Sequence, residues 1–467
     1  MLFNSYVFLF GFLPAVLAGW WGLSRWRQPR LAFLTCASWL FYAWWDWRFL
    51  PVLIGATSVD YVAGGWIAAS ESESRRRLLL AASLTTNLGI LAYFKCTGFF
   101  FSSLDGIGSA LGLGAPLPAL HTLLPIGISF YTFNSMSYTI DIFRRRVEPT
   151  HDLLEYTTFV ALFPHLIAGP IVRFTDLGPQ LKRLTPRLTS DAAALGVFFL
   201  SCGLVKKLLI ADQLSPYVNN LYGRHAHLGL VTGWAAAIGY SLQLYFDFSG
   251  YSDMAVGLAW LLGFGFPQNF NSPFKAANIS DFWRRWNMTL SSWFRDYLFI
   301  PLGGSRRGAR RTVLNLVLTM FLVGLWHGAA WTFVVWGLVH GLYLGSHAVL
   351  RKAGLTPNSV PLNRLLTFLA VCAAFVIFRS PTIPVAGDVL SSMLGLHGLD
   401  APAQLDALLP LKFAVLIGAL LAFVNVAPNT WQIRLRPRVW HGVAVGVVAA
   451  IAVMTISQPH PFIYFQF

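Results

Sequence analysis

One histidine, His327, is the side chain whose type and surroundings best suit chemistry. It lies within the stretch from Thr312 to Leu350, which contains no Asp, Glu, Lys or Arg. Because an ionisable side chain at membrane depth is costly, it is a functional candidate, and an imidazole can act as a general base. The alternative is a structural histidine that hydrogen-bonds a neighbouring helix, an interpretation that suits His340 and His347 better.

A second candidate region, from Asn269 to Arg311, combines basic, aromatic and glycine residues. Helical spacing predicts an amphipathic helix at the cytoplasmic surface, with one aromatic stripe made of Phe282, Trp286, Trp293 and Tyr297. Such a helix can anchor the chain to anionic lipid, and its surface can equally hold the phosphates and adenine ring of a nucleotide-containing donor. The residues that would bind such a donor are Arg284, Arg285, Trp286, Arg295, Arg306 and Arg307.

Two carboxylates, Asp247 and Asp253, lie in apolar surroundings on either side of Gly250. They could form an acid–base pair or a cation site, but their spacing puts them on different sides of one continuous helix. Capping and packing roles are therefore favoured, unless Gly250 breaks that helix. The loop residues His225 and His227 lack a further ligand at a diagnostic spacing, so no metal site is predicted. The sequence also contains no phosphate loop, dinucleotide fingerprint or GxSxG elbow.

The elements that must position these residues are membrane helices. Hydrophobic residues make up 56% of the 467-residue chain and charged residues only 11%, against about 25% charged in an ordinary soluble domain. The apolar residues fall into long runs, which predict an all-α polytopic membrane protein with about 11 to 13 transmembrane or re-entrant helices. We expect one integral-membrane domain over residues 1–467, with the run from Thr312 to Leu350 divided into two spans near Gly328.

The charge balance indicates topology. The 34 basic and 19 acidic residues leave a formal net charge of +15, and the basic residues form short clusters between the apolar runs. This pattern marks cytoplasmic loops and places both termini outside the cytoplasm, whereas a nucleic-acid partner would require a solvated basic patch. The run from 155 to 172, which Pro164 interrupts, is predicted to enter and leave by the same membrane face.

Several ordered segments carry a family resemblance over nearly the whole chain. They are Leu325-Trp-His-Gly328, Leu124–Phe133, Ser137–Asp141, Phe163–Arg173, Asn269–Phe274, Trp293–Tyr297 and Phe462–Phe467. On these segments the chain resembles the membrane-bound O-acyltransferases, and within them the bacterial branch of alginate O-acetyltransferase-like proteins.

The resemblance implies a helical membrane body in which opposed funnels meet at a buried histidine, and His327 matches that histidine. It also implies a second polar position, where many bacterial relatives carry a histidine and this chain has Asn287. An asparagine can hydrogen-bond and orient a substrate but cannot shuttle a proton. The donor expected for such a site is acetyl-CoA, used as a substrate, with no tightly bound cofactor.

The expected function is transfer of an acetyl group from cytoplasmic acetyl-CoA for O-acetylation of an exported polysaccharide, alginate or cellulose. The resemblance implies a protein of the bacterial inner membrane, so the termini that the basic clusters place outside the cytoplasm would lie in the periplasm. The partners it implies are a periplasmic SGNH-type acetyltransferase, the exopolysaccharide secretion machinery and membrane lipids. The alternative is a non-enzymatic transporter or export-channel component, since buried polar residues in broken helices would also line a substrate path.

Overall fold

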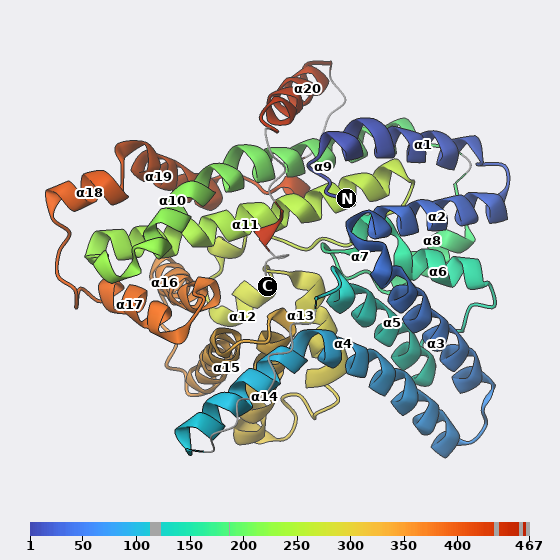
Figure 1. Cartoon of the computed structure of the whole chain (residues 1–467), viewed down its shortest axis with the longest axis horizontal. Coiled ribbons are helices and arrows are strands. Elements are labelled where there is room, and N and C mark those ends of the chain that lie inside the picture. The colour runs from blue at the N-terminus through green and yellow to red at the C-terminus, as the bar shows by residue number, and fades with distance from the viewer. Residues whose placement is uncertain (113–122, 186, 434–438, 457–460, 464–467) are drawn as a thin grey trace. The chain divides into compact units, whose positions relative to one another are not determined.

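The computed structural model describes residues 1–112, 123–185, 187–433, 439–456 and 461–463, and these ranges are helical with no β-strand (Figure 1). The all-α prediction is therefore confirmed. The chain divides into two compact units, Met1–Phe198 with Ala255–Pro267, and Phe199–Met254 with Gln268–Phe467. The expectation of a single domain over residues 1–467 stays a prediction. The last part of the segment Phe462–Phe467, residues 464–467, lies outside the described residues.

The first unit is built mainly from the N-terminal helices, coloured blue to blue-green in Figure 1. They are η1 (Val7–Phe12), α1 (Leu13–Gly22), α2 (Arg27–Asp46), η2 (Trp47–Phe49), α3 (Leu50–Ala69), α4 (Glu73–Ala110), α5 (Ile128–Phe143), α6 (Leu153–Ala161), α7 (Phe163–Leu166), α8 (Phe174–Lys182) and the start of α9 (Ser190–Leu204). Helix α3 packs against α4 and α5, and α2 packs against α6.

The second unit contains the remaining helices. They are η3 (Val205–Ala211), α10 (Asp212–Gly223), η4 (His225–His227), α11 (Leu230–Leu261), η5 (Pro273–Lys275), α12 (Ile279–Trp283), α13 (Met288–Phe294), η6 (Arg295–Phe299), α14 (Gly308–His327), α15 (Trp331–Lys352), α16 (Val360–Arg379), α17 (Ile383–Met393), α18 (Pro402–Leu408), α19 (Leu411–Val426), η7 (Thr430–Gln432) and α20 (Val439–Met454). Helix α11 also contributes its last residues to the first unit.

Six helical stretches of the described chain are long and apolar enough to cross a membrane. They are Arg27–Ala69, Glu73–Ala110, Ser190–Gly223, Gly308–His327, Trp331–Lys352 and Val360–Arg379, and the pair α18 and α19, bent by 69°, adds a seventh if it forms one span. These stretches make the chain a multi-pass membrane protein. The predicted total of about 11 to 13 passes also counts shorter and broken helices, and that total stays a prediction.

Two predicted helix breaks are present. Helix α14 ends at His327 and α15 begins at Trp331, so the division of the long apolar run near Gly328 is confirmed. The run from 155 to 172 is also interrupted, because α6 ends at Ala161 and the short α7 follows with a proline in its first turn. Whether this run enters and leaves by one membrane face stays a prediction.

Helices α14 and α15 lie side by side as an antiparallel pair in which glycines allow very close contact. A Cβ atom on Gly324 would lie 2.3 Å from the carbonyl oxygen of Phe333, and one on Gly337 would lie 2.4 Å from that of Met320. Membrane helices, which gain little from the hydrophobic effect between them, are held by close packing of this kind. The contact fixes the C-terminal end of α14, where His327 lies.

Candidate active site

His327 is buried at the last position of α14 among aromatic rings. Its ring centroid lies 4.9 Å from that of Trp326, 5.1 Å from that of Trp336 on α15 and 5.2 Å from that of Phe378 on α16. Three elements thus hold the imidazole in one orientation. They also shield it from bulk water, a setting in which charges and dipoles act on a reacting group more strongly than in water.

The segment before α13 does not form the continuous amphipathic helix that the sequence predicts, so that prediction is wrong. Helix α12 ends at Trp283, and α13 begins only at Met288. Between them Asn287 adopts a left-handed conformation with φ of 41°, which an asparagine tolerates better than most residues. The amide of Met288 donates to the carbonyl oxygen of Asn269 at 2.9 Å, so the preceding loop stabilises the break.

The Asn269-Phe-Asn-Ser-Pro-Phe segment supplies further support for this break. The side-chain oxygen of Asn269 accepts hydrogen bonds from both the amide and the hydroxyl of Thr289, at 3.2 and 2.8 Å. The amide of Asn271 donates to the carbonyl oxygen of Arg285 at 2.8 Å. The residues on both sides of Asn287 are therefore hydrogen-bonded to one loop, and the side chain of Asn269 supplies two of these bonds.

The aromatic residues of the predicted stripe are buried in the protein instead of facing a membrane surface. Phe282, Trp286, Trp293 and Tyr297 are all buried. Trp286 stacks on Phe282 with ring centroids 5.6 Å apart and lies 5.1 Å from Phe375 of α16. Trp286, one of the predicted donor-binding residues, lies in an aromatic core that anchors the α12–α13 turn.

Asn287 combines a strained backbone with an unsatisfied side chain. The residue is 2% exposed, and its side-chain oxygen has no hydrogen-bond partner among the described residues. A buried polar group without a partner costs about 1–3 kcal/mol, and strained backbone conformations cluster at functional sites. Asn287 is therefore the side chain of this segment best suited to accept a hydrogen bond from a ligand.

A cavity of about 290 Å³ lies between α12, α13 and α14. Its lining includes Leu290 on α13, one turn beyond Asn287, and Val323 on α14, one turn before His327. The helix that begins after Asn287 and the helix that ends in His327 thus form two of its walls. The cavity is largely apolar, and the charged residues that line it are Arg284 and Arg295.

The predicted donor-binding arginines separate into three groups. Arg284 and Arg295 line the cavity. Arg295 pairs with Asp296 at 2.7 Å from nitrogen to oxygen; this hydrogen bond raises the pKa of Arg295 above its ordinary value and places a carboxylate beside its charge. Arg285 lies half-buried outside the cavity lining and pairs with Asp281 at 2.9 Å, which neutralises its charge.

Arg306 and Arg307 form the third group. They are exposed in the loop between η6 and α14, and neither lines the cavity. Gly303 in the same loop has φ of 107°, and a Cβ atom there would lie 3.0 Å from the Cδ atom of Arg307. Of the six residues predicted to bind a donor, the structure therefore brings only Arg284 and Arg295 to one cavity.

The two histidines of α15, His340 and His347, differ from His327 of α14. His340 is fully buried, and its Nδ1 atom accepts a hydrogen bond from the indole nitrogen of Trp283 at 3.3 Å. This contact ties α15 to α12, as the structural interpretation expects. His347 is half-buried near the C-terminal end of α15, where it lines a separate pocket.

Two lysines that sequence reasoning missed explain Asp247 and Asp253. Lys207 lies 2.8 Å from Asp247, and Lys206 lies 2.5 Å from Asp253. Helix α11 continues through Gly250, so the acid–base pair that a broken helix would have allowed does not form. In the sequence, both lysines lie about one helical turn after Gly203, and both carboxylates lie about one turn from Gly250. Charges placed this close to glycines, where helices can approach each other, are a signal that could have indicated these pairs.

These ion pairs lie where two helices meet closely. A Cβ atom on Gly250 would lie 2.9 Å from the carbonyl oxygen of Gly203, so neither position has room for a larger residue without movement. The lysines follow Gly203 in η3, a π-helical segment, and the carboxylates flank Gly250 on α11. Because each charge is paired, these two ion pairs join η3 to α11, and neither carboxylate is left free to act in a catalytic dyad. We call this arrangement the η3–α11 joint.

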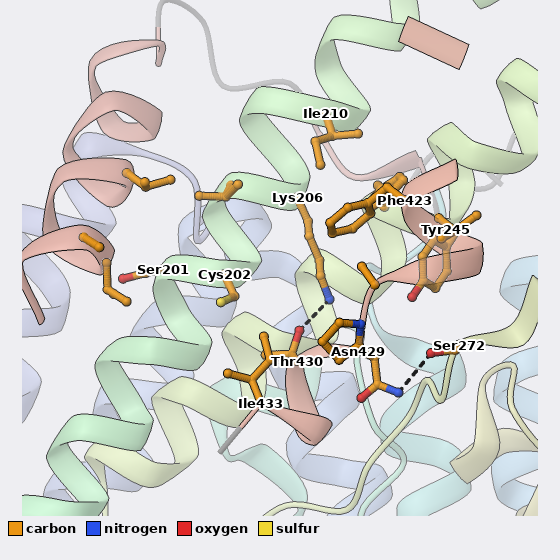
Figure 2. Close-up of a pocket in the computed structure, with 18 residues that line it drawn as sticks. Ser201, Cys202, Lys206, Ile210, Tyr245, Ser272, Phe423, Asn429, Thr430 and Ile433 are labelled. Atoms are coloured by element: carbon orange, nitrogen blue, oxygen red, sulfur yellow. Dashed lines mark hydrogen bonds between the residues drawn. The ribbon is translucent and has the colours of Figure 1, made fainter. Parts of the chain in front are cut away.

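Figure 2 shows an apolar pocket of about 340 Å³ beside this joint. The ammonium of Lys206 donates to the hydroxyl of Thr430 at 2.9 Å, and the amide of Asn429 donates to the hydroxyl of Ser272 at 3.1 Å. These four polar groups thus form two hydrogen-bonded pairs, and the ring of Phe423 supplies part of the apolar wall.

The chain belongs to the membrane-bound O-acyltransferase family, whose sequence profile matches residues 6–353. It is therefore an O-acyltransferase, and the predicted family is confirmed. The transporter alternative has no comparable support.

Similar proteins include two probable alginate O-acetylases. The one from Azotobacter vinelandii is 44% identical over 84% of this chain and 78% of its own length. The one from Pseudomonas putida is 39% identical over the full length of both chains. A peptidoglycan O-acetyltransferase of Helicobacter pylori is 37% identical over 86% of this chain and 81% of its own length.

Proposed function

We propose that the protein takes an acetyl group from cytoplasmic acetyl-CoA and passes it across the bacterial inner membrane for O-acetylation of an exported polysaccharide. Relatives named as alginate O-acetylases, at 39% and 44% identity, make alginate the first candidate polymer, ahead of cellulose. The relative named as a peptidoglycan O-acetyltransferase supports the broader class of extracytoplasmic polymers.

The observation that carries this proposal is the cavity between α13 and α14. Its walls are the helix that ends in His327 and the helix that begins after Asn287, and two arginines line it. An apolar cavity suits an acetyl group with its thioester. Guanidinium groups suit the phosphates of the CoA part, because arginine forms charge-assisted hydrogen bonds with phosphate oxygens.

In the proposed reaction His327 acts as the general base. It accepts the proton of an acceptor hydroxyl while the hydroxyl oxygen attacks the thioester carbonyl carbon. A C–O bond forms, the C–S bond breaks, and the proton passes from His327 to the departing thiolate to give free CoA. General-base assistance of this kind contributes about 100- to 10,000-fold to the rate.

Asn287 has a positioning role in the proposed reaction. Its side-chain oxygen has no partner among the described residues and can accept a hydrogen bond from the acceptor hydroxyl or from the amide groups of the donor. Its side-chain nitrogen can donate toward the carbonyl oxygen as negative charge develops there. The left-handed backbone holds the amide in place, so little ordering is needed when substrate binds.

The proposed topology combines this reaction with the basic clusters between the apolar runs, which favour termini outside the cytoplasm. The donor binds from the cytoplasm at Arg284 and Arg295, and both chain termini lie in the periplasm. The acetyl group then reaches a periplasmic SGNH-type acetyltransferase that modifies the polymer, in association with the exopolysaccharide secretion machinery.

The test compares His327→Ala with His441→Ala, which changes an exposed histidine of α20. Polymer O-acetyl content in cells and consumption of labelled acetyl-CoA by purified protein should both disappear only in His327→Ala, at equal protein level. Full polymer acetylation by His327→Ala would overturn the role of the histidine. Loss of polymer acetylation by that variant, with no labelled acetyl-CoA consumed by the wild-type protein, would overturn acetyl-CoA as donor.

A further inference from the structure

A second pocket, of about 490 Å³, lies where α12, the end of α15 and the start of α16 meet. Three basic side chains line it: Arg284 after α12, and His347 and Arg351 on α15. No Asp or Glu is among its lining residues within the described chain. The pocket therefore concentrates positive charge on one side of the molecule's second unit.

The charge in this pocket has no counter-ion among the residues that the structure describes. Arg285, which follows Arg284 directly, and Arg295 on η6 are each paired with an aspartate. Arg284 and Arg351 form no ion pair with any residue that the structure describes. Like charges that share one pocket repel each other, so an anion bound there would be stabilised by both guanidinium groups.

The polar atoms around these cations suit a phosphate group. Tyr343, Ser346 and Thr356 add hydroxyl groups to the lining, which can donate to phosphate oxygens. Guanidinium groups bind phosphate with two parallel hydrogen bonds, a geometry that gives both energy and specificity. The pocket thus combines charge with several neutral donors.

The position of the pocket and its apolar rim indicate where the phosphate comes from. Helices α15 and α16 are both apolar enough to cross a membrane, so the end of one and the start of the next lie at a membrane surface. Leu350 and Leu366 line the pocket and are 43% and 50% exposed, and Leu362 and Leu365 extend the exposed apolar face along α16. A soluble anion would bury none of this apolar surface, whereas the acyl chains of a lipid can pack against it.

We infer that this pocket binds the phosphate headgroup of an anionic phospholipid, whose acyl chains lie along the exposed leucines of α15 and α16. Basic pockets between membrane helices recognise anionic headgroups in this way. Arg284 lines both this pocket and the cavity beside α14, so a bound lipid contacts a residue of the proposed donor site. The inference itself does not rest on the proposed function, because lipid binding is measured without acyl transfer.

The experiment measures thermal unfolding of the full chain, purified in a neutral detergent, with added phosphatidylglycerol or phosphatidylcholine. Phosphatidylglycerol should raise the Tm of the wild-type protein more than phosphatidylcholine does. Arg351→Gln and His347→Gln should each weaken the apparent affinity for phosphatidylglycerol, by about tenfold for the arginine. Lys352→Gln is the matched control, since Lys352 is an exposed cation at the same helix end that does not line the pocket.

Three outcomes would overturn the inference. One is an equal rise in Tm by both lipids, and a second is an equal response to phosphatidylglycerol in Arg351→Gln, His347→Gln and Lys352→Gln. The third concerns adenosine 3′,5′-bisphosphate, which carries phosphates like those of CoA. If it gives the Arg351-dependent rise and phosphatidylglycerol does not, the pocket belongs to a nucleotide donor. Because two separate variants are used, failure of one to fold leaves the other decisive.

Discussion

The protein contains two buried sets of one histidine and one asparagine, and they differ in how their polar atoms are used. In the first unit, the side-chain nitrogen of Asn134 lies 3.0 Å from the Nδ1 atom of His165. In the second unit, Asn287 precedes α13 and His327 ends α14, and these two helices form walls of a cavity that neither side chain lines. The side-chain oxygens of Asn134 and Asn287 both lack a partner among the described residues. The same residue types therefore form a packing contact in one place and a candidate site in the other.

Local packing explains the first set. His165 lies in the short helix α7, and the chain just beyond it passes very close to Gly127, where a Cβ atom would lie 2.6 Å from the carbonyl oxygen of Leu166. Gly127 has φ of 77° and begins α5, the helix that carries Asn134. The Asn134–His165 contact thus connects α5 and α7 where their backbones approach closely.

The largest expected effect comes from removing the imidazole of the second set. His327→Ala should lower acyl transfer by about 100- to 10,000-fold, because it removes the proposed general base. The measurement is the rate of acetyl-CoA consumption per amount of folded protein. His165→Ala provides the comparison, and an equal loss of rate per folded molecule in that variant would break the distinction between the two sets.

Asn287 allows its side chain and its backbone to be tested separately. Asn287→Ala removes the amide and places a residue with a Cβ in the left-handed region, whereas Asn287→Gly removes the amide and relieves the backbone. If the amide steadies the reacting groups, both variants should lose about 100-fold in kcat. If Asn287→Gly keeps the wild-type kcat and only Asn287→Ala lowers it, the residue is needed for its left-handed backbone conformation and not for its side-chain amide.

The packing that holds His327 should be sensitive to small enlargements. Gly324→Ala places a methyl group against the carbonyl oxygen of Phe333 and should destabilise the protein by about 1–3 kcal/mol, with a smaller loss of rate than His327→Ala. Thermal unfolding and kcat measure the two effects. Gly418→Ala, on α19, is the matched control, because a Cβ atom there meets nothing within 4 Å. An unchanged Tm in Gly324→Ala would contradict the close contact.

The smallest effect on rate is expected for the first set. Asn134→Ala leaves a buried histidine nitrogen without its partner and should destabilise the protein by about 1–3 kcal/mol while the rate per folded molecule is kept. Thermal unfolding together with the rate normalised to folded protein measures both quantities. A normal Tm with a large loss of rate would instead move the first set into the active site.

The sequence predicted much of the architecture correctly. Charge-poor runs identified membrane helices, and the glycine after His327 marked the boundary between α14 and α15. The buried position of His327 also followed from its uncharged surroundings. These features could be predicted because hydropathy and helix ends depend mainly on neighbouring residues.

The prediction failed where distant segments decide local structure. Helical spacing in the stretch from 281 to 297 indicated one amphipathic helix, but hydrogen bonds from Met288 and Thr289 to Asn269 stabilise a break at Asn287. Periodicity cannot report a contact with a loop that precedes the helix. For the same reason Trp286, expected on a binding surface, lies in an aromatic core with Phe375.

By itself the sequence determined the class of protein and its helical membrane character, and it singled out His327 as a candidate, because composition and short motifs carry that information. Only the tertiary structure decided which charges are free to bind. It paired Lys206 and Lys207 with aspartates of α11, paired Arg285 with Asp281, and left Arg284 facing two pockets. Charge pairing depends on distances between side chains across helices, and the order of residues along the chain does not contain those distances.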